Sequence, residues 1–254
     1  MIELQQVSFG YPARSQLFQD FSLSFPEGRI TSILGTNGSG KSTLLKLAAR
    51  LLNPQQGQVL LDGKDLHSMK SKEVAKRISL LHQNNFPPEI TVSTLVSYGR
   101  YPYQKYGQGL SQKDLEIVEN ALTQVQLQDL RNNLLPRLSG GQRQRAFIAM
   151  ALAQDTNIVF LDEPTTYLDI KIKLELMDLV HFLNQQGKTI IMVLHDLNLA
   201  LENSHNIVLL EHGKLFSQGT PEQIIKTGLL DKVFSIQTHV FHKDGKTFHH
   251  FTRQ

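Results

Sequence analysis

A glycine-rich segment carries the clearest chemical signal in this sequence of 254 residues. Residues 35–42 read Gly-Thr-Asn-Gly-Ser-Gly-Lys-Ser and fit the pattern G-x-x-x-x-G-K-S, between a predicted strand and a predicted helix. Glycines let the backbone curl so that its N–H groups point at phosphate oxygens, and the following helix adds its positive end. We therefore predict a phosphate-binding loop, with Lys41 on the β- and γ-phosphates and Ser42 on Mg²⁺. The alternative, a glycine-rich turn with a surface lysine, does not explain both flanks.

Two carboxylates follow an apolar run of strand length. Residues 158–161 read Ile-Val-Phe-Leu and lead into Asp162 and Glu163. Acids at the carboxyl end of a parallel strand lie where ligands bind in such sheets. We expect Asp162 to help hold Mg²⁺ and Glu163 to act as general base toward an attacking water. Two solvated acids at a strand end are the alternative, which the nearby glycine loop disfavours.

A second set of backbone donors is predicted at residues 138–142, Leu-Ser-Gly-Gly-Gln. Ser139 followed three residues later by Gln142 forms a capping box that would start a helix. Gly140 and Gly141 in the first turn each cost up to about 1 kcal/mol relative to alanine, so capping alone does not explain them. Glycines there permit close approach of an anion to the helix start. Because one nucleotide does not need both loops, we expect a second chain to use this one, in a dimer that closes around ATP.

Three further residues gain weight from the motifs around them. His195 follows the apolar run 189–194, which places it at the sheet edge of Asp162, and we favour a contact with the γ-phosphate over a structural role. Gln83 also ends a predicted strand. Tyr11 precedes a proline and is a candidate to stack on an adenine ring, with surface packing in a turn as the alternative.

The remaining sequence predicts an α/β protein. Apolar strands that alternate with helices indicate a mostly parallel sheet covered on both faces. We expect a single domain over 1–254, with a core formed by 1–83 and 154–254 and a helical subdomain inserted at 84–153. The expected strands are 2–9, 21–25, 29–34, 58–61, 78–83, 158–161 and 189–194; the expected helices are 42–52, 114–125, 139–153 and 171–184; and a hairpin is expected within 239–250.

Composition excludes several classes of protein. The net charge of +3 is a mild, scattered excess, so we expect no nucleic acid partner. There is no cysteine, which excludes disulfides and thiolate metal sites. The amino terminus lacks the features of a signal peptide, and the longest apolar runs are strand length, so we expect no membrane span. Four histidines lie within 239–250, but no acidic ligand set accompanies them, and metal binding is not favoured there.

Six motifs in a fixed order give the chain a family resemblance. The tyrosine turn, the phosphate loop, Gln83, the 138–142 segment, the acidic strand and His195 together resemble the ATP-binding subunit of ATP-binding cassette (ABC) importers over nearly the whole length. The resemblance implies a P-loop nucleoside-triphosphatase core with an N-terminal antiparallel β subdomain. It also implies a head-to-tail homodimer with two ATP and Mg²⁺ at its interface, in which the pair Leu168-Asp169 touches the opposite subunit.

The resemblance assigns a role to each motif residue. The catalytic set is Lys41, Gln83, Glu163 and His195. The metal ligands are Ser42, Gln83 and Asp162. Nucleotide contacts come from Tyr11, Gly35, Thr36, Asn37, Gly38, Ser39, Gly40, Lys41, Ser42 and Thr43 of one chain and from Ser139, Gly140, Gly141 and Gln142 of the other. Many relatives carry proline where this chain has Thr36, a departure that softens the loop slightly and removes no ligand.

A narrower resemblance concerns residues 97–103 and 164–170, which look like the branch that serves iron–siderophore, haem and cobalamin importers, the ferrichrome type above all. It implies a subunit on the cytoplasmic face of the cell membrane. A cytoplasmic helix of the membrane permease would enter a cleft that follows Gln83 and includes Arg100 and Tyr101. The subunit would also be linked indirectly to an extracytoplasmic substrate-binding protein. Ferric siderophore is the expected cargo. The alternatives are haem or cobalamin, a soluble ABC ATPase outside transport, and a nonenzymatic nucleotide sensor.

Overall fold

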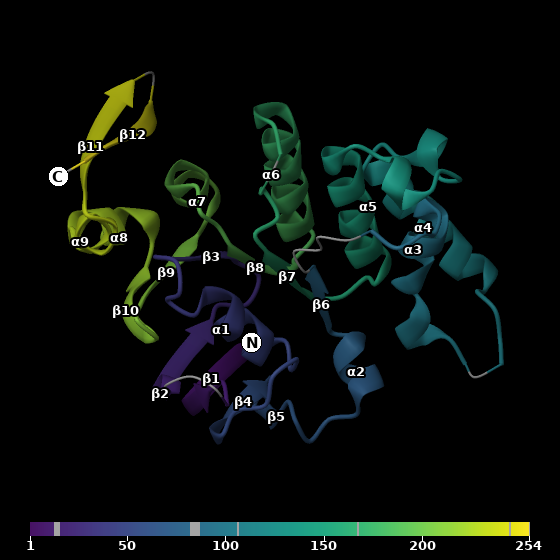
Figure 1. Cartoon of the computed structure of the whole chain (residues 1–254), viewed down its shortest axis with the longest axis horizontal. Helices are drawn as coiled ribbons and strands as arrows, with labels where there is room; N and C mark the ends of the chain where they lie inside the picture. Colours follow the sequence, from purple (N-terminus) through teal and green to yellow (C-terminus); the bar gives the residue numbers. More distant parts are fainter. Residues whose placement is uncertain (13–15, 82–86, 106, 167, 244, 254) are drawn as a thin grey trace. The chain divides into compact units, whose positions relative to one another are not determined.

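The computed structural model describes residues 1–12, 16–81, 87–105, 107–166, 168–243 and 245–253 (Figure 1). The chain divides into two compact units. The first comprises Met1–His67 and Ile191–Gln254, and the second comprises Ser68–Ile190. Strand β8 (Thr189–Val193) contributes residues to both units.

The first unit begins with an antiparallel sheet in the order β2-β1-β4-β5. Its strands are β1 (Ile2–Gly10), β2 (Gln16–Phe25), β4 (Gln56–Leu61) and β5 (Lys64–Asp65). Alternation in β2 buries Phe21, Leu23 and Phe25 while the serines between them stay exposed. One face of this sheet is therefore core and the other is solvated, as expected for antiparallel strands. The predicted N-terminal β subdomain is confirmed.

The same unit contains a second sheet in the order β10-β9-β3-β8. Its other strands are β3 (Ile30–Gly35), β9 (Asn206–Glu211) and β10 (Lys214–Gly219). β3 and β9 are parallel, with Thr31 opposite Asn206, and β10 is antiparallel to β9. Every residue of β3 is buried, as expected for a strand of a sheet that is covered on both faces. Helices α1 (Lys41–Ala48) and α7 (Leu197–Asn203) follow β3 and β8.

Helix α1 ends four residues before the predicted end at Leu52. Arg50 takes a left-handed conformation (φ 60°), and Leu51 N–H donates to Lys46 O at 2.8 Å. Arg50 N–H donates to Leu47 O at 3.0 Å. These two bonds form a Schellman motif, which closes the helix by satisfying its last carbonyls. The sequence gives no sign of this stop because arginine occupies the position that usually holds glycine.

The C-terminal part of the first unit contains two short helices and a hairpin (Figure 1, yellow). The elements are α8 (Pro221–Lys226), α9 (Leu229–Phe234), β11 (Ile236–Lys243) and β12 (Lys246–Arg253). The predicted hairpin is confirmed and is longer than 239–250. His239 lies opposite His250 in the register. Asp244 of the predicted turn lies outside the described residues.

The second unit combines the other end of the parallel sheet with most of the helices. Here the order is β8-β7-β6, and β6 (Ile78–Leu81) runs parallel to β7 (Ile158–Asp162) with Ile78 opposite Ile158. The helices are α2 (Ser71–Ala75), α3 (Val92–Tyr98), α4 (Gln112–Gln124), α5 (Gly140–Ala153) and α6 (Ile170–Gln185). Helices α3, α4 and α5 pack against one another. Within the described part of the chain, no helix combines the length and apolarity that a bilayer span requires.

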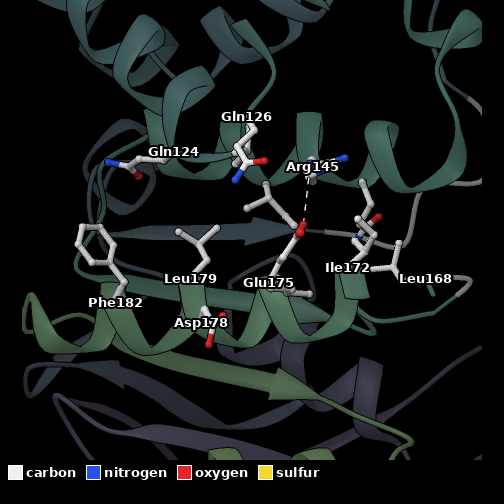
Figure 2. A pocket seen from close by; sticks show the side chains of 13 residues that line it. Gln124, Gln126, Arg145, Leu168, Ile172, Glu175, Asp178, Leu179 and Phe182 are labelled. Atoms are coloured by element: carbon white, nitrogen blue, oxygen red, sulfur yellow. Dashed lines mark ion pairs between the residues drawn. The ribbon is translucent and has the colours of Figure 1, made fainter. Parts of the chain in front are cut away.

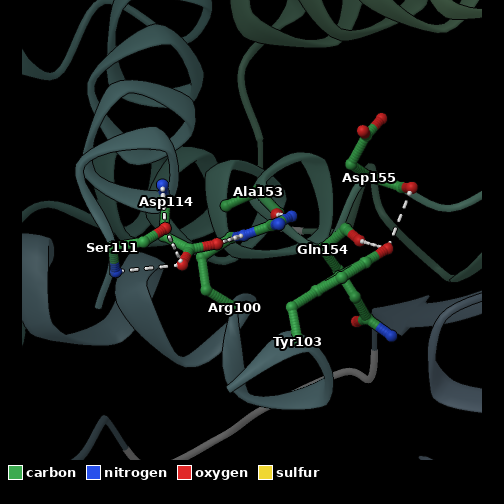
Figure 3. A network of polar contacts seen from close by, with 7 residues as sticks. All are labelled: Arg100, Tyr103, Ser111, Asp114, Ala153, Gln154 and Asp155. Atoms are coloured by element: carbon green, nitrogen blue, oxygen red, sulfur yellow. Dashed lines mark hydrogen bonds and ion pairs between the residues drawn. The ribbon is translucent and has the colours of Figure 1, made fainter. Parts of the chain in front are cut away.

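A buried ion pair ties the helices of the second unit together (Figure 3). Arg100 Nε donates to Asp114 Oδ1 at 2.8 Å, and its Nη1 donates to Ala153 O at 2.7 Å. The Arg100 guanidinium lies 3.9 Å from the centre of the Tyr103 ring, whose hydroxyl donates to Gln154 O at 2.9 Å. Arg100 is only 5% exposed. Its predicted part in a permease cleft is therefore wrong, because the side chain is committed to joining α3, α4 and α5.

The N-cap of α4 lowers the pKa of Asp114, the acid of this pair. The Ser111 hydroxyl donates to Asp114 Oδ2 at 2.6 Å, and Ser111 N–H donates to the same oxygen at 3.1 Å. These bonds, followed by the contact with Arg100, hold the pKa of Asp114 below its usual value. Because the native pKa is lowered, the stability that Asp114 contributes is complete above its unfolded pKa of about 3.9 and is lost as pH falls toward the native pKa.

We expect Asp114→Asn to lower the free energy of unfolding by about 3 kcal/mol at pH 7, because the change leaves the Arg100 charge buried without its partner. Urea unfolding followed by circular dichroism measures the effect, and the gap between variant and wild type should narrow below pH 4 or so as Asp114 protonates. The exposed Asp129→Asn is the matched control and should change stability by less than about 0.5 kcal/mol. Equal effects of the two variants would contradict a role for the buried pair.

Candidate active site

The loop between β3 and α1 has a backbone that requires glycine. Gly35, Gly38 and Gly40 have φ values of 155°, 80° and 103°. A Cβ on Gly35 would lie 2.3 Å from Leu210 O, and a Cβ on Gly40 would lie 2.8 Å from Phe18 Cζ. Both neighbours are buried. The curled loop that the sequence predicts is thus fixed by packing against β9 and β2 as well as by its own turns.

The lysine of this loop is folded back into it. Lys41 Nζ donates to Gly35 O at 2.9 Å and to Thr36 O at 3.0 Å, and the residue is 6% exposed. The ammonium is thereby held within the curl of the loop. Ser39 Oγ is also buried and has no hydrogen-bond partner in the part of the chain that the structure describes. Polar groups buried at a helix start suit an anionic ligand.

Tyr11 and His195, two further candidates for nucleotide contact, lie in the same unit as this loop. The Tyr11 hydroxyl lies 3.1 Å from Thr43 Oγ1 in α1, and the Tyr11 ring packs edge-on to Phe9 at 5.1 Å. Leu194 N–H donates to Ile33 O at 3.4 Å, so the end of β8 lies beside β3. His195 follows directly and is exposed. His195 and the phosphate loop therefore lie at the same edge of the sheet; stacking of Tyr11 on adenine stays a prediction.

The second unit holds the acids. Asp162 is the last residue of β7 and is 6% exposed. Glu163 follows with φ 52°, a left-handed conformation that is uncommon for a residue other than glycine and clusters at functional sites. The Glu163 carboxylate accepts a hydrogen bond from Thr166 Oγ1 at 3.3 Å, and Gln144 Nε2 donates to Pro164 O at 3.1 Å. The chain thus enters a turn at Glu163 and is held there by Thr166 and Gln144, which the sequence does not single out.

The predicted capping box at the start of α5 is confirmed. Gln142 N–H donates to Ser139 Oγ at 3.2 Å, and Ser139 N–H donates to Gln142 Oε1 at 2.9 Å. A Cβ on Gly140 would meet nothing within 4 Å, and a Cβ on Gly141 would meet Ile172 Cγ1 at an ordinary 3.6 Å. Among the residues that the structure describes, packing therefore does not require glycine at either position. The exposed first turn has room for a partner that the chain itself does not supply.

A cavity of about 340 Å³ lies between the end of α4, α5 and α6 (Figure 2). Arg145 reaches from α5 toward Glu175 on α6, with Nη1 and Oε2 3.9 Å apart, and Leu179 and Phe182 point into the space from α6. The cavity lies entirely within the second unit. Its walls include the helix that begins at the Ser139 cap and the helix that begins at the Asp169 cap, where Ile172 N–H donates to Asp169 Oδ1 at 2.9 Å.

The structure thus brings the predicted site residues together in two groups. The first unit contains Tyr11, the whole loop from Gly35 to Thr43, and His195. The second contains Asp162 and Glu163 together with the segment from Ser139 to Gln142. Gln83 lies outside the described residues.

The residues present have the chemistry that Mg²⁺ prefers. Ser42 offers a hydroxyl oxygen directly after the phosphate loop, and Asp162 offers a buried carboxylate at the end of β7. Mg²⁺ in such sites takes oxygen ligands from one or two side chains and completes its shell with phosphate oxygens and water. Each of these oxygens is a ligand of the kind that Mg²⁺ takes, and the chemistry that the ion supplies in such sites is to neutralise charge on the phosphates.

A strand that runs into a G-x-x-x-x-G-K-S loop and helix, with a second parallel strand that ends in acids, defines a P-loop nucleoside triphosphatase. The chain matches the family model described as ABC transporter over residues 18–166. The chain belongs to the ABC transporter family and is an ATPase of that family.

Relatives cover most of the chain. A Bacillus subtilis protein described as a probable siderophore transport system ATP-binding protein, YusV, is 45% identical over 94% of this chain and 87% of its own. The Bacillus anthracis petrobactin import ATP-binding protein FpuC is 44% identical over 98% and 92%. The Escherichia coli ferric enterobactin transport ATP-binding protein FepC is 42% identical over 92% and 86%.

Solved structures agree with the fold. An inward-facing metal-chelate-type ABC transporter matches with a TM-score of 0.82 at 26% identity, over 99% of this chain and 96% of that one. A dimeric ATP-binding cassette bound to ADP and phosphate after hydrolysis matches with a TM-score of 0.77 at 30% identity, over 87% and 99%. The predicted α/β P-loop fold is confirmed.

We expect the two sets of glycines to respond differently to alanine. Gly40→Ala should lower the free energy of unfolding by about 2 kcal/mol, because it combines a left-handed backbone with a clash against buried Phe18. Gly140→Ala should leave stability unchanged or raise it by up to about 1 kcal/mol, since alanine favours helix. Urea unfolding of the two variants makes the comparison. Equal destabilisation would show that packing within the chain does require Gly140.

Proposed function

We propose that this chain is the ATP-hydrolysing subunit of an ABC importer that takes up ferric siderophore through a membrane permease. The observation that carries the proposal is the pairing of a phosphate loop with a capped helix start at whose two glycines the described residues leave room for a Cβ. The relatives described as siderophore, petrobactin and enterobactin transport proteins support the cargo. The subunit then lies on the cytoplasmic face of the membrane.

In this proposal ATP joins two copies head to tail. Residues 35–43 of one chain bind the phosphates, with Tyr11 on the adenine. The first turn of α5 in the other chain points its N–H groups at the γ-phosphate, and the N-cap hydroxyl of Ser139 adds to them. Negative charge on the phosphate favours closure because donors of both chains meet it. Loss of the γ-phosphate removes that bridge, and the dimer reopens.

Hydrolysis needs a water, a base and charge stabilisation. Glu163, which directly follows β7 and has a left-handed backbone, accepts a proton from the attacking water. Lys41 and His195 stabilise the charge that develops on the γ-phosphate. Ser42, Asp162 and Gln83 hold Mg²⁺. The attacking oxygen forms a bond to the γ-phosphorus as the bond to the β–γ bridging oxygen breaks, giving ADP and phosphate.

Residues 84–153 form the helical subdomain of this proposal and face the permease. The packing of α3, α4 and α5 supports it. Tyr98 and Tyr101 are 37% and 56% exposed, and their rings stack at 4.9 Å. Exposed aromatic pairs of this kind are favourable anchors for a partner. The rigid Arg100–Asp114 pair beneath them would transmit a push from the permease to α5, whose first turn meets the nucleotide.

We expect Glu163→Gln to keep ATP binding and to lower kcat at least about 100-fold, because the amide cannot accept the proton. The variant should form a dimer in Mg-ATP, measured by size-exclusion chromatography with light scattering. Exposed Glu116→Gln is the matched control and should hydrolyse ATP at the wild-type rate. Normal turnover in Glu163→Gln would remove Glu163 as the base. A variant that stays monomeric in saturating Mg-ATP, with its permease supplied, would contradict the dimer.

Uptake by cells that lack this chain tests the cargo. Ferric hydroxamate and catecholate siderophores, haem and cobalamin are supplied separately as labelled compounds. We expect uptake of a ferric siderophore to fall to background and to return with the wild-type gene or with Lys46→Ala, which lies on the same helix as Lys41. Lys41→Ala should fail to restore it, since the phosphates lose their cation. Loss of haem or cobalamin uptake instead would reassign the cargo.

A further inference from the structure

The start of α5 is attached to the turn that holds the predicted base. Gln144 lies one turn into α5, and its Nε2 donates to Pro164 O at 3.1 Å. Pro164 directly follows Glu163 and is buried. The hydrogen bond therefore joins the helix of the Leu-Ser-Gly-Gly-Gln segment to the backbone of the acidic turn, within the second unit.

Other contacts at this junction are looser. A Cβ on Gly141 would lie 3.6 Å from Ile172 Cγ1, which is ordinary van der Waals contact. Arg145 and Glu175 approach to 3.9 Å, beyond hydrogen-bond distance, and Arg145 Nε has no hydrogen-bond partner in the described chain. The cavity of about 340 Å³ borders Arg145, Ile172 and Glu175 (Figure 2). The bond from Gln144 to Pro164 O, at 3.1 Å, is the shortest of these contacts, and it is a directional tether from α5 to the turn at Glu163.

The turn at Glu163 needs such a tether. A left-handed glutamate is a strained backbone that persists only when its surroundings hold it. The Thr166 hydroxyl holds the Glu163 carboxylate, and Gln144 holds the peptide carbonyl one residue further on. Movement of α5 would therefore pull on the backbone beside the base and change where its carboxylate points.

We propose that Gln144 is a positioning residue that couples the two ATP sites of the dimer. The inference rests on the proposed function, in which the start of α5 completes the ATP site of the partner subunit while Glu163 acts on the ATP of its own chain. Closure of α5 onto the partner's nucleotide then sets Glu163 for hydrolysis through the bond from Gln144 to Pro164 O. Hydrolysis at either site thereby depends on occupancy of both.

The test uses the full-length chain and three variants, with ATPase rate measured against ATP concentration. Gln144→Met keeps the length and bulk of the side chain and removes the donor. Gln144→Lys keeps an N–H donor at similar reach. Gln124→Met makes the same chemical change on the α4 side of the same cavity.

We expect Gln144→Met to lower kcat about tenfold and to bring the Hill coefficient of the wild type down toward one. Nucleotide affinity and dimer formation in a Glu163→Gln background should stay within about twofold, because the phosphate loop and the first turn of α5 are intact. Gln144→Lys should restore most of the rate and the Hill coefficient. Gln124→Met should behave as the wild type.

The outcomes separate this inference from the proposed function. The coupling is overturned if the wild type has a Hill coefficient of one. It is also overturned if Gln144→Met has the kcat and the Hill coefficient of the wild type. In both cases ATP hydrolysis and dimer formation still stand. A lowered rate in Gln144→Met that Gln144→Lys does not restore, with a lowered unfolding temperature, shows a purely structural role and overturns it too. A wild type that neither hydrolyses ATP nor dimerises with its permease present fails the proposed function itself.

Discussion

The reversal of the chain at the carboxyl ends of buried parallel strands is the constraint on which the rest of this structure depends. β3 ends at Gly35 and β7 ends before Glu163, and both residues have a positive φ. Each strand is buried along its length, so side chains beyond its end are the first that reach a ligand. The sheet therefore fixes where the phosphate loop and the acids begin, and the turns decide where their polar atoms point.

The turns are held by different means because their residues differ. Gly35 adopts its conformation without a steric penalty, and the packing of Leu210 against it forbids any side chain. Glu163 must keep its carboxylate, so the left-handed backbone is strained and is held by Thr166 and by Gln144. Strain at the Glu163 turn thus has a direct structural consequence, since it makes the position of the acid depend on a neighbouring helix.

The sequence predicts those segments in which the chemistry and the local structure require the same residues. The phosphate loop, the acidic strand and the capping box at Ser139 were predicted from spacing alone, because glycine, lysine and paired acids have few other uses in that order. The hairpin within 239–250 is predicted by the turn residues Asp244 and Gly245. The predicted end of α1 is four residues too late, because Arg50 closes the helix without a glycine. Strands β9 and β10 are not predicted at all. Arg100 was misplaced because its burial against Asp114 depends on tertiary packing that the sequence does not reveal.

The glycines at the starts of α1 and α5 are present for different reasons. Gly40 is required by packing within the chain, whereas a Cβ on Gly140 would meet nothing within 4 Å and one on Gly141 would make only ordinary van der Waals contact, in a turn where alanine would be more stable. The glycines lower the stability of the α5 start, although packing against the described residues does not require them. A partner that approaches the backbone of this turn best explains them. The capping box secures the helix despite those glycines, so the N–H groups stay directed outward and available. In the proposed dimer, the stability lost in the isolated chain would be recovered when a second chain brings its nucleotide to the same turn.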